Sequence, residues 1–362
     1  MARRPRRSSG PLDFRAQAIL RAVIEEYVTS AAPVSSQALV ERYGLGVSSA
    51  TVRNVLAELE AFGYLTHPHT SAGRVPTDAG YRLYVESIAE GESPPPVEQR
   101  MIRHQFGQVE YASEHWFRLA ASTLAGLTRS AGLATPAKPE AARIRRVDLV
   151  AINERLASLI LVLREGTIKQ LMVNLPAPTD QADLAAIAAR LDDLAAGLTA
   201  DELGTRLGRL AEDAASGGAD EPRTMDLILL VGGRIVRTLR EFDAAVIEDV
   251  FSDGLLNVME APEFAQSDKL RRVFAALENR AYLGRLVEAV ARAGVTQVFI
   301  GHENLPAEMT EVSLVLAPYG QPGRAVGVVG VLGPTRMAYP HAIGTVRFVS
   351  GLMNELVEHL YA

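Results

Sequence analysis

The sequence predicts a multidomain protein of the α+β class. At 362 residues the chain exceeds the length of about 250 residues at which a single hydrophobic core stops growing. Apolar residues recur at helical spacing in the first part of the chain, three prolines follow at 94–96, and short segments rich in Val, Ile and Leu begin at Ile144. These changes divide the chain into a helical N-terminal unit and a larger mixed body.

Composition excludes several classes of protein. The chain contains no cysteine, which rules out disulfide scaffolds, thiolate metal sites and cysteine nucleophiles and fits a reducing compartment. No stretch reaches the ~18 apolar residues that a membrane span requires, and the basic start lacks the apolar region of a signal peptide. We therefore expect a cytoplasmic protein with no membrane partner.

Charge is distributed unevenly along the chain. The net charge is −6, but residues 1–90 carry 10 Arg and no Lys against 9 Asp plus Glu, which gives +1 and leaves −7 for the remainder. Four of these arginines lie within residues 1–11, which we interpret as a basic N-terminal arm. A basic end on an acidic body is typical of a DNA-binding module joined to a regulatory body. The charge distribution by itself also fits a solvated N-terminal tail that binds nothing.

Residues 12–90 predict a helix-turn-helix unit. A helix over 12–30 is stopped by Pro33, a short helix follows over 37–43, and a glycine turn leads to a third helix from Ala50 to about 62. The apolar residues of the third helix fall on one face, which must be directed to the core: Val52, Val55, Leu56 and Leu59. The opposite face is therefore free.

The free face of the third helix has the residue types that read DNA. Small residues let a helix lie deep in the major groove, while Arg suits guanine and Asn suits adenine. The helices alone also fit an ordinary three-helix bundle, but two short extended pieces at 64–68 and 73–77 enclose a polar tip, like a wing, and favour DNA. The candidate base-reading residues are Thr51, Arg53 and Asn54, and the candidate backbone contacts are Ser48, Ser49, His69, Arg74 and Arg82.

The rest of the chain mixes helices and strands. Residues 91–98 form a Pro-rich linker, and a helical stretch over 97–130 follows. Three strands at 146–152, 156–164 and 167–173 predict an antiparallel meander. After them we expect helices over 180–215 and 268–293, a hairpin over 226–239 that turns at two glycines, strands at 297–300, 311–317 and 324–332, and a closing helix over 341–360.

Several long phrases of the sequence point to a known family. They are SATVRN at 49–54, LEAFGYL at 59–65, HTSAGRVPTDAGYR at 69–82, FSDGLLNV at 251–258, IGHEN at 300–304 and VLGPTRMAYP at 331–340. In their residues and in their order along the chain, these segments resemble the heat-inducible transcription repressor family, HrcA. The resemblance covers nearly the whole chain.

This resemblance implies both a fold and a function. The fold would be a winged helix-turn-helix at 12–90, then a GAF-like α/β domain at 99–176 and 291–362 that is interrupted by an inserted dimerising α/β domain at 177–290. The function would be that of a homodimer that binds an inverted-repeat operator in the double-stranded DNA of chaperone operons. Such a repressor would release DNA on heat shock, and the chaperonin would modulate it as a partner.

No catalytic, cofactor or metal site is expected, so we predict that the protein is not an enzyme. His67 and His69 bracket a proline and lack a third metal ligand, and no histidine forms a triad with a flagged serine. Arg336 follows a strand and is more simply structural than a ligand clamp. The alternative function is that of a ligand-sensing winged-helix regulator whose GAF-like domain binds a small metabolite.

Overall fold

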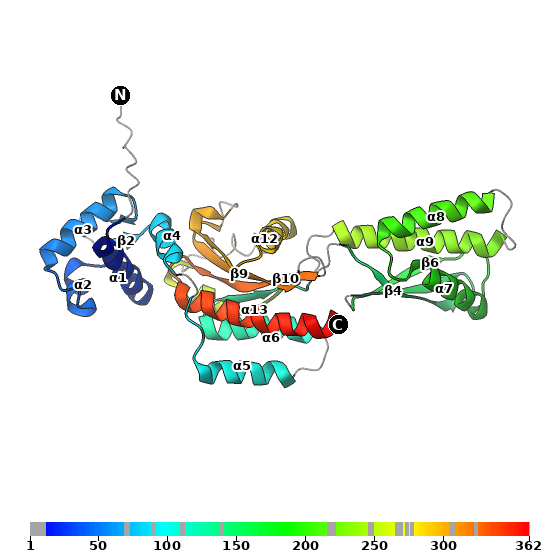
Figure 1. Ribbon diagram of the computed structural model, residues 1–362, viewed down its shortest axis with the longest axis horizontal. Helices are drawn as coiled ribbons and strands as arrows, with labels where there is room; N and C mark the ends of the chain where they lie inside the picture. Colours follow the sequence, from blue (N-terminus) through cyan, green and yellow to red (C-terminus); the bar gives the residue numbers. More distant parts are fainter. Residues whose placement is uncertain are drawn as a thin grey trace, which may run out of the picture.

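The computed structural model arranges the chain as three units along one long axis (Figure 1). It describes residues 12–68, 73–88, 91–108, 113–137, 141–164, 166–215, 222–244, 250–264, 271, 275, 279–304, 309–321 and 325–361. The predicted mixture of α and β structure is confirmed. None of the helices in these ranges is both long and apolar enough to cross a lipid bilayer.

The N-terminal unit consists of helices and a small ribbon of two strands. Its elements are α1 (Phe14–Ser30), α2 (Ser36–Tyr43), α3 (Ser49–Ala61), β1 (Leu65–Thr66), β2 (Val75–Pro76) and α4 (Asp78–Glu86). Each helix begins where a side chain accepts a hydrogen bond from the first turn: Asp13, Ser35, Ser48 and Thr77. The three helices expected at 12–30, 37–43 and 50–62 are thus confirmed.

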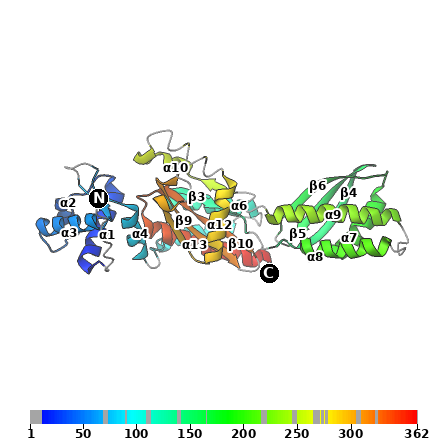
Figure 2. The ribbon, with the colours of Figure 1, turned by 90° about the horizontal axis from the view of Figure 1, so that it is seen from above.

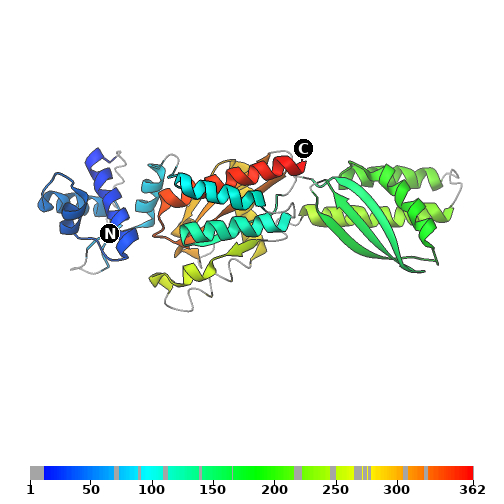
Figure 3. The same cartoon turned by 90° about the horizontal axis from the view of Figure 1, so that it is seen from below.

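The central unit is built on a five-stranded antiparallel sheet of order β7-β3-β10-β9-β8. The strands are β3 (Ala131–Ala134), β7 (Phe251–Asp253), β8 (Gln297–Ile300), β9 (Val312–Gln321) and β10 (Ala325–Pro334). One face packs on α6 (Ser113–Thr128) and α13 (Tyr339–Tyr361), with α5 (Pro96–Gln108) outside them, as Figure 3 shows from below. The other face packs on α10 (Leu255–Met259) and α12 (Arg280–Ala293), which Figure 2 shows from above.

The third unit has its own sheet and its own core. The strands β4 (Ile144–Asn153), β5 (Leu156–Leu163) and β6 (Ile168–Asn174) pair antiparallel in sequence order, so the predicted meander is confirmed. The helices α7 (Gln181–Ala195), α8 (Ala200–Asp213) and α9 (Pro222–Ala244) cover one face of this sheet and share a hydrophobic cluster with it. No helix among the described residues of this unit covers the second face (Figure 3).

The boundaries predicted for the inserted unit therefore need correction. We expected residues 177–290 to be inserted, but the meander at 144–174 shares its core with α7 to α9 and not with the central sheet. The strand β7 and the helix α12 belong to the central unit, because β7 pairs with β3 and α12 packs on the central sheet. Alternating apolar residues predict a strand without predicting which sheet it joins, since the sheet is decided by long-range pairing.

The hairpin expected at 226–239 is wrong, because this segment lies inside the single helix α9. Its buried residues recur every four positions on one face: Leu227, Val231, Ile235 and Leu239. Gly232 is there for packing rather than for a turn, since a Cβ at that position would lie 2.8 Å from both δ carbons of Leu207 on α8. The hairpin was predicted because two adjacent glycines are typical of a tight turn.

The Pro-rich segment between the first two units is docked on α13. The backbone N–H of Glu92 donates to the carbonyl of Pro340 at 2.7 Å. Gly344 allows this close approach, because a Cβ there would lie 1.9 Å from the Glu92 carbonyl oxygen. The predicted linker is thus shorter than 91–98, with α5 beginning at Pro96, and the single helix expected over 97–130 is the pair α5 and α6.

Candidate nucleic-acid interface

The amino end of α3 is fixed by hydroxyl groups. The Oγ of Ser48 accepts a hydrogen bond from the backbone N–H of Thr51 at 3.2 Å and lies 3.0 Å from the Thr51 hydroxyl. The hydroxyls of Ser36 and Ser49 lie 3.1 Å apart and connect the starts of α2 and α3. Because these four hydroxyls form two hydrogen-bonded pairs, the serines of this turn have a structural role whether or not DNA is present.

The outward face of α3 presents a free cation and a free amide. Val52, Leu56 and Leu59 are buried, which directs Arg53 and Asn54 to the opposite, exposed face. Within the described part of the chain, neither Arg53 nor Asn54 has a hydrogen-bonding or ionic partner. Long polar side chains without an internal partner, on a helix that begins with small residues, are what groove reading requires.

The ribbon beside α3 is anchored through Arg74. Its backbone N–H and carbonyl exchange hydrogen bonds with Val34, each at 2.8 Å, and a Cβ at Gly73 would lie 2.5 Å from the Val34 carbonyl. The Arg74 guanidinium also pairs with Glu60 of α3 at 2.7 Å. Arg74 is therefore positioned by the protein itself, next to the helix, while His69 lies outside the described residues.

Glu60 is the residue of this site that the sequence analysis missed. One carboxylate oxygen binds Arg74, and the other contacts the Nδ1 atom of His67 just after β1. This carboxylate thus holds both strands of the ribbon against the end of α3. The signal that could have revealed it was an acidic residue on the free face of a helix that is predicted to read DNA, since such a charge repels phosphate unless it is paired.

Arg82 does not lie with the other candidates, and we do not include it in the interface. On α4 its Nε donates to Glu303 at 2.7 Å and one terminal nitrogen donates to the Val298 carbonyl at 2.6 Å. The hydrogen bonds that Arg82 donates to Glu303 raise the pKa of its guanidinium further. Its position on α4 directs it to the central unit, and a paired guanidinium has few donors left for phosphate.

A second contact joins the same helix to the central unit. Asp78, the first residue of α4, accepts a hydrogen bond from the backbone N–H of His302 at 2.9 Å, and the His302 ring lies 2.6 Å from the same oxygen. Gly301 makes room for this carboxylate, because a Cβ there would lie 2.3 Å from it. The N-terminal unit is therefore attached to the central unit through α4.

Arg336 makes a third contact between these units. It forms an ion pair with Glu263 and donates to the carbonyl of Val28, at the end of α1, at 3.2 Å. This is the structural kind of role that the sequence analysis favoured for it. Together the three contacts involve α4 and the end of α1, and none of them uses a residue of α3.

Comparisons with known proteins assign the chain to a family. Residues 114–343 match the family model for the HrcA protein C terminal domain. The heat-inducible transcription repressor HrcA of Roseiflexus castenholzii is 41% identical over 351 residues, covering 97% of this chain and 96% of the relative. The protein of the same name from Chloroflexus aurantiacus is 41% identical over 367 residues, covering 98% and 96%. The one from Dehalococcoides mccartyi strain 195 is 35% identical over 347 residues, covering 96% of each.

One solved structure supports the fold. A crystal structure described as a hypothetical protein at 2.2 Å resolution aligns with a TM-score of 0.60 at 21% identity, covering 96% of this chain and 99% of that one. Likeness at that identity concerns the fold alone. The sequence relatives carry the assignment, because their similarity extends over almost the whole length of both chains: the protein belongs to the heat-inducible transcription repressor HrcA family.

Proposed function

We propose that this protein is a heat-shock transcription repressor that binds double-stranded DNA as a homodimer, at an inverted-repeat operator in chaperone operons. The observation that carries the proposal is the outward face of α3, where Arg53 and Asn54 are exposed and have no partner among the described residues. Family membership supports the repressor function. The N-terminal unit then acts as a winged helix-turn-helix, with α3 as its recognition helix.

Each candidate residue has a distinct part in this proposal. Thr51, Arg53 and Asn54 read base edges in the major groove, where a bidentate Arg or Asn discriminates by about 1–3 kcal/mol. Ser48 and Ser49 lie at the amino end of α3, where a phosphate is favoured by the helix dipole. Arg74, held by Glu60, contacts the backbone beside the groove, and His69 at the tip of the ribbon is predicted to do the same.

The experiment is a footprint and a binding titration on the promoter of a chaperone operon. Arg53→Ala is expected to weaken binding to the protected site by about 10- to 100-fold and to relax its preference over scrambled DNA. Arg190→Ala removes an exposed arginine of α7 in the third unit and is the matched charge control, with binding unchanged. Equal losses for Arg53→Ala on cognate and scrambled DNA would contradict base reading by α3.

The homodimer is supported by the uncovered face of the β4-β5-β6 sheet. Four apolar side chains on this face are exposed by 42% to 65%: Val150, Ile152, Ile168 and Met172. The register places Val150 and Met172 on either side of the buried Ser158, so the exposed apolar residues of the two outer strands share one face. Exposed apolar residues gathered on one face mark an interface, and a second copy of the chain supplies an identical face.

Charge introduced on this face tests the dimer. Ile168→Lys is expected to shift the protein toward monomer in sedimentation velocity, because a lysine would be desolvated between the two sheets. Val295→Lys alters an equally exposed valine outside this sheet and should leave the oligomeric state unchanged. A dimer that survives Ile168→Lys and Met172→Lys together would place the interface elsewhere.

Proteins are usually stable by only a few kcal/mol. If the free energies of dimerisation and of DNA binding exceed the values needed for repression by a similarly small amount, heating releases the DNA. Operator affinity measured from the growth temperature upward is expected to fall steeply over a narrow range, together with the dimer fraction. Affinity that persists well above that range would contradict thermal release. A GAF-like central unit and a chaperonin partner stay predictions that rest on the family resemblance.

A further inference from the structure

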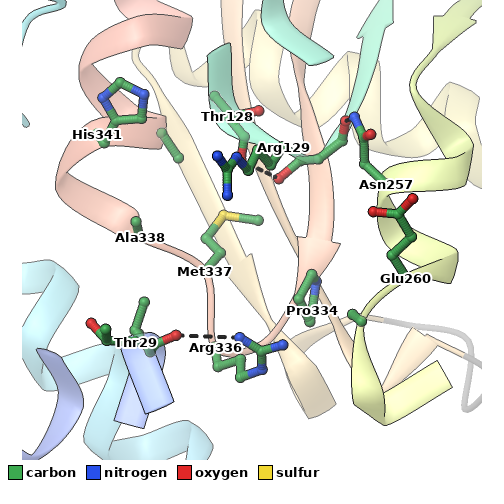
Figure 4. A pocket seen from close by; sticks show the side chains of 14 residues that line it. Thr29, Thr128, Arg129, Asn257, Glu260, Pro334, Arg336, Met337, Ala338 and His341 are labelled. Atoms are coloured by element: carbon green, nitrogen blue, oxygen red, sulfur yellow. Dashed lines mark hydrogen bonds between the residues drawn. The ribbon is translucent and has the colours of Figure 1, made fainter. Parts of the chain in front are cut away.

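A cavity of about 590 Å³ lies between the N-terminal and central units. Its walls come from the end of α1, the end of α6, α10, and the segment that leads from β10 into α13 (Figure 4). This volume is within the range of pockets that hold small molecules, about 300–1,000 Å³. The side chains around it are mixed, with apolar groups such as Met337 beside charged ones.

The described side chains around this cavity carry one unpaired positive charge and one unpaired negative charge. Arg129, Arg336 and His341 line it, against the single acidic residue Glu260 among the described lining residues. Glu263 neutralises Arg336, whereas Arg129 is exposed and has no hydrogen-bonding or ionic partner in the described part of the chain. The Nε2 atom of His341 lies 3.0 Å from the Leu127 carbonyl, which holds the ring at the wall. The free positive charge of the cavity is thus that of Arg129.

The backbone at Arg129 is unusual for an arginine. This residue directly follows the last residue of α6 and has a φ of 51°, in the left-handed region. Helices commonly end on a residue of that conformation, but glycine or asparagine fills the position because a side chain costs about 1 kcal/mol or more there. The chain therefore places a guanidinium at this wall at an energetic cost, as is typical of functional positions.

The amino end of α13 adds to the attraction. Ala338, His341 and Ala342 line the cavity, so the first turn of this 23-residue helix borders it. The backbone N–H groups of Tyr339 and Ala342 donate to the carbonyls of Met337 and Ala338, and Pro340 has no N–H, so the attraction comes from the helix dipole, which carries partial positive charge at this end. Glu260 and Asn257 lie on the α10 wall (Figure 4), where a hydroxyl or amino group of an occupant would be accepted.

We propose that this cavity binds a small organic anion, which bears a carboxylate or phosphate group toward Arg129 and His341 and a hydrogen-bond donor toward Glu260. Guanidinium groups bind both kinds of acid through paired hydrogen bonds. An occupant also touches Val28 and Thr29 of α1, so it links the N-terminal unit to the central one. The proposal concerns ligand binding and is independent of DNA binding.

Titration of the full-length protein with three probes tests the site. Inorganic phosphate, citrate and 3-phosphoglycerate are each added while thermal unfolding and the heat of binding are followed, with sodium chloride at equal ionic strength as reference. At least one probe is expected to raise the unfolding midpoint saturably and with one site per chain. A response to citrate alone identifies carboxylates as the ligand class, and a response to the two phosphates identifies phosphate.

Substitution at Arg129 separates ligand binding from a structural role. Arg129→Gly is expected to raise the midpoint without probe, because glycine relieves the left-handed strain, and to weaken probe affinity by about tenfold or more. Arg129→Lys keeps the charge and part of the affinity, and Arg190→Ala, which removes a distant exposed arginine, behaves like the wild type. If no probe exceeds the effect of sodium chloride, or if Arg129→Gly responds like the wild type, the proposal is overturned.

Discussion

The carboxylate of Glu60, near the end of α3, lies 2.7 Å from the guanidinium of Arg74, beside β2. Both side chains are exposed by only 25%, and the second oxygen of Glu60 contacts His67 across the ribbon. One carboxylate thus sets the angle between the helix proposed to read bases and the ribbon proposed to contact the backbone. In the proposed function, base reading and backbone contact are therefore coupled through Glu60.

Glu60→Gln is the direct test of this coupling. The amide keeps the shape but loses the charge that Arg74 and His67 share, so we expect the free energy of unfolding to fall by about 1 kcal/mol. DNA affinity should weaken on cognate and scrambled sequences alike, because the position of Arg74 is no longer held. Denaturant unfolding and binding titrations measure the two effects.

Glu58→Gln is the matched control, since Glu58 is exposed on the same helix and has no partner among the described residues. It removes the same charge and should leave stability within about 0.5 kcal/mol of the wild type. DNA binding should not fall either. Similar losses in stability for both variants would mean that the ion pair with Arg74 is without consequence.

The contact between Arg82 and Glu303 is predicted to stabilise the junction of the first two units. A double-mutant cycle with Arg82→Met and Glu303→Gln is expected to give a coupling free energy of about 1 kcal/mol, because the pair is hydrogen-bonded through two nitrogens and only about a third exposed. The pair Arg240 and Asp201, exposed by 61% and 87%, should couple by less than about 0.5 kcal/mol. Equal coupling in the two cycles would refute the prediction.

Two glycines of α13 are predicted to respond oppositely to the same change. Gly351→Ala should stabilise the protein by about 0.5–1 kcal/mol, because no atom lies within 4 Å of the added methyl group and alanine favours a helix. Gly344→Ala should destabilise it by about 1–3 kcal/mol, because the methyl group would meet the Glu92 carbonyl at 1.9 Å. Thermal unfolding of the two variants distinguishes the outcomes, and a gain at both positions would show that residues 91–95 are not docked on α13.

Alkaline pH is predicted to destabilise the fold through buried tyrosines. Burial raises the pKa of Tyr84 and of Tyr282 to about 12, and it also raises the pKa of Tyr81 and Tyr339. Unfolded tyrosine titrates near a pKa of about 10, so the folded chain holds these protons more tightly and stability is fully present below pH 10. The stabilisation that these buried phenols contribute should be lost as the pH rises from about 10 to about 12. Tyr84→Phe should reduce the slope of the unfolding free energy against pH by up to one proton, and an unchanged slope would contradict the role of this phenol.

Much of the N-terminal unit could be predicted because its signals are local. The caps at Ser35 and Ser48 mark where α2 and α3 begin, and the spacing of Val52, Leu56 and Leu59 fixes which face of α3 is free. These properties depend on neighbours a few positions away in the chain. The position of Arg53 and Asn54 on an exposed helical face therefore followed from the sequence.

Only the tertiary structure decided which distant segments meet. Glu60 meets Arg74, Arg82 meets Glu303 and Arg129 borders the cavity because of packing across 14 to more than 200 residues of chain, which no local spacing encodes. The same cause explains the errors at 226–239 and at the boundaries of the third unit. Gly232, which serves close packing, was interpreted with Gly233 as a turn, and strands were assigned to the wrong sheet. By itself the sequence determined the first three helices of the N-terminal unit, the meander and the family resemblance, because capping, periodicity and uninterrupted sequence motifs are properties of neighbouring residues.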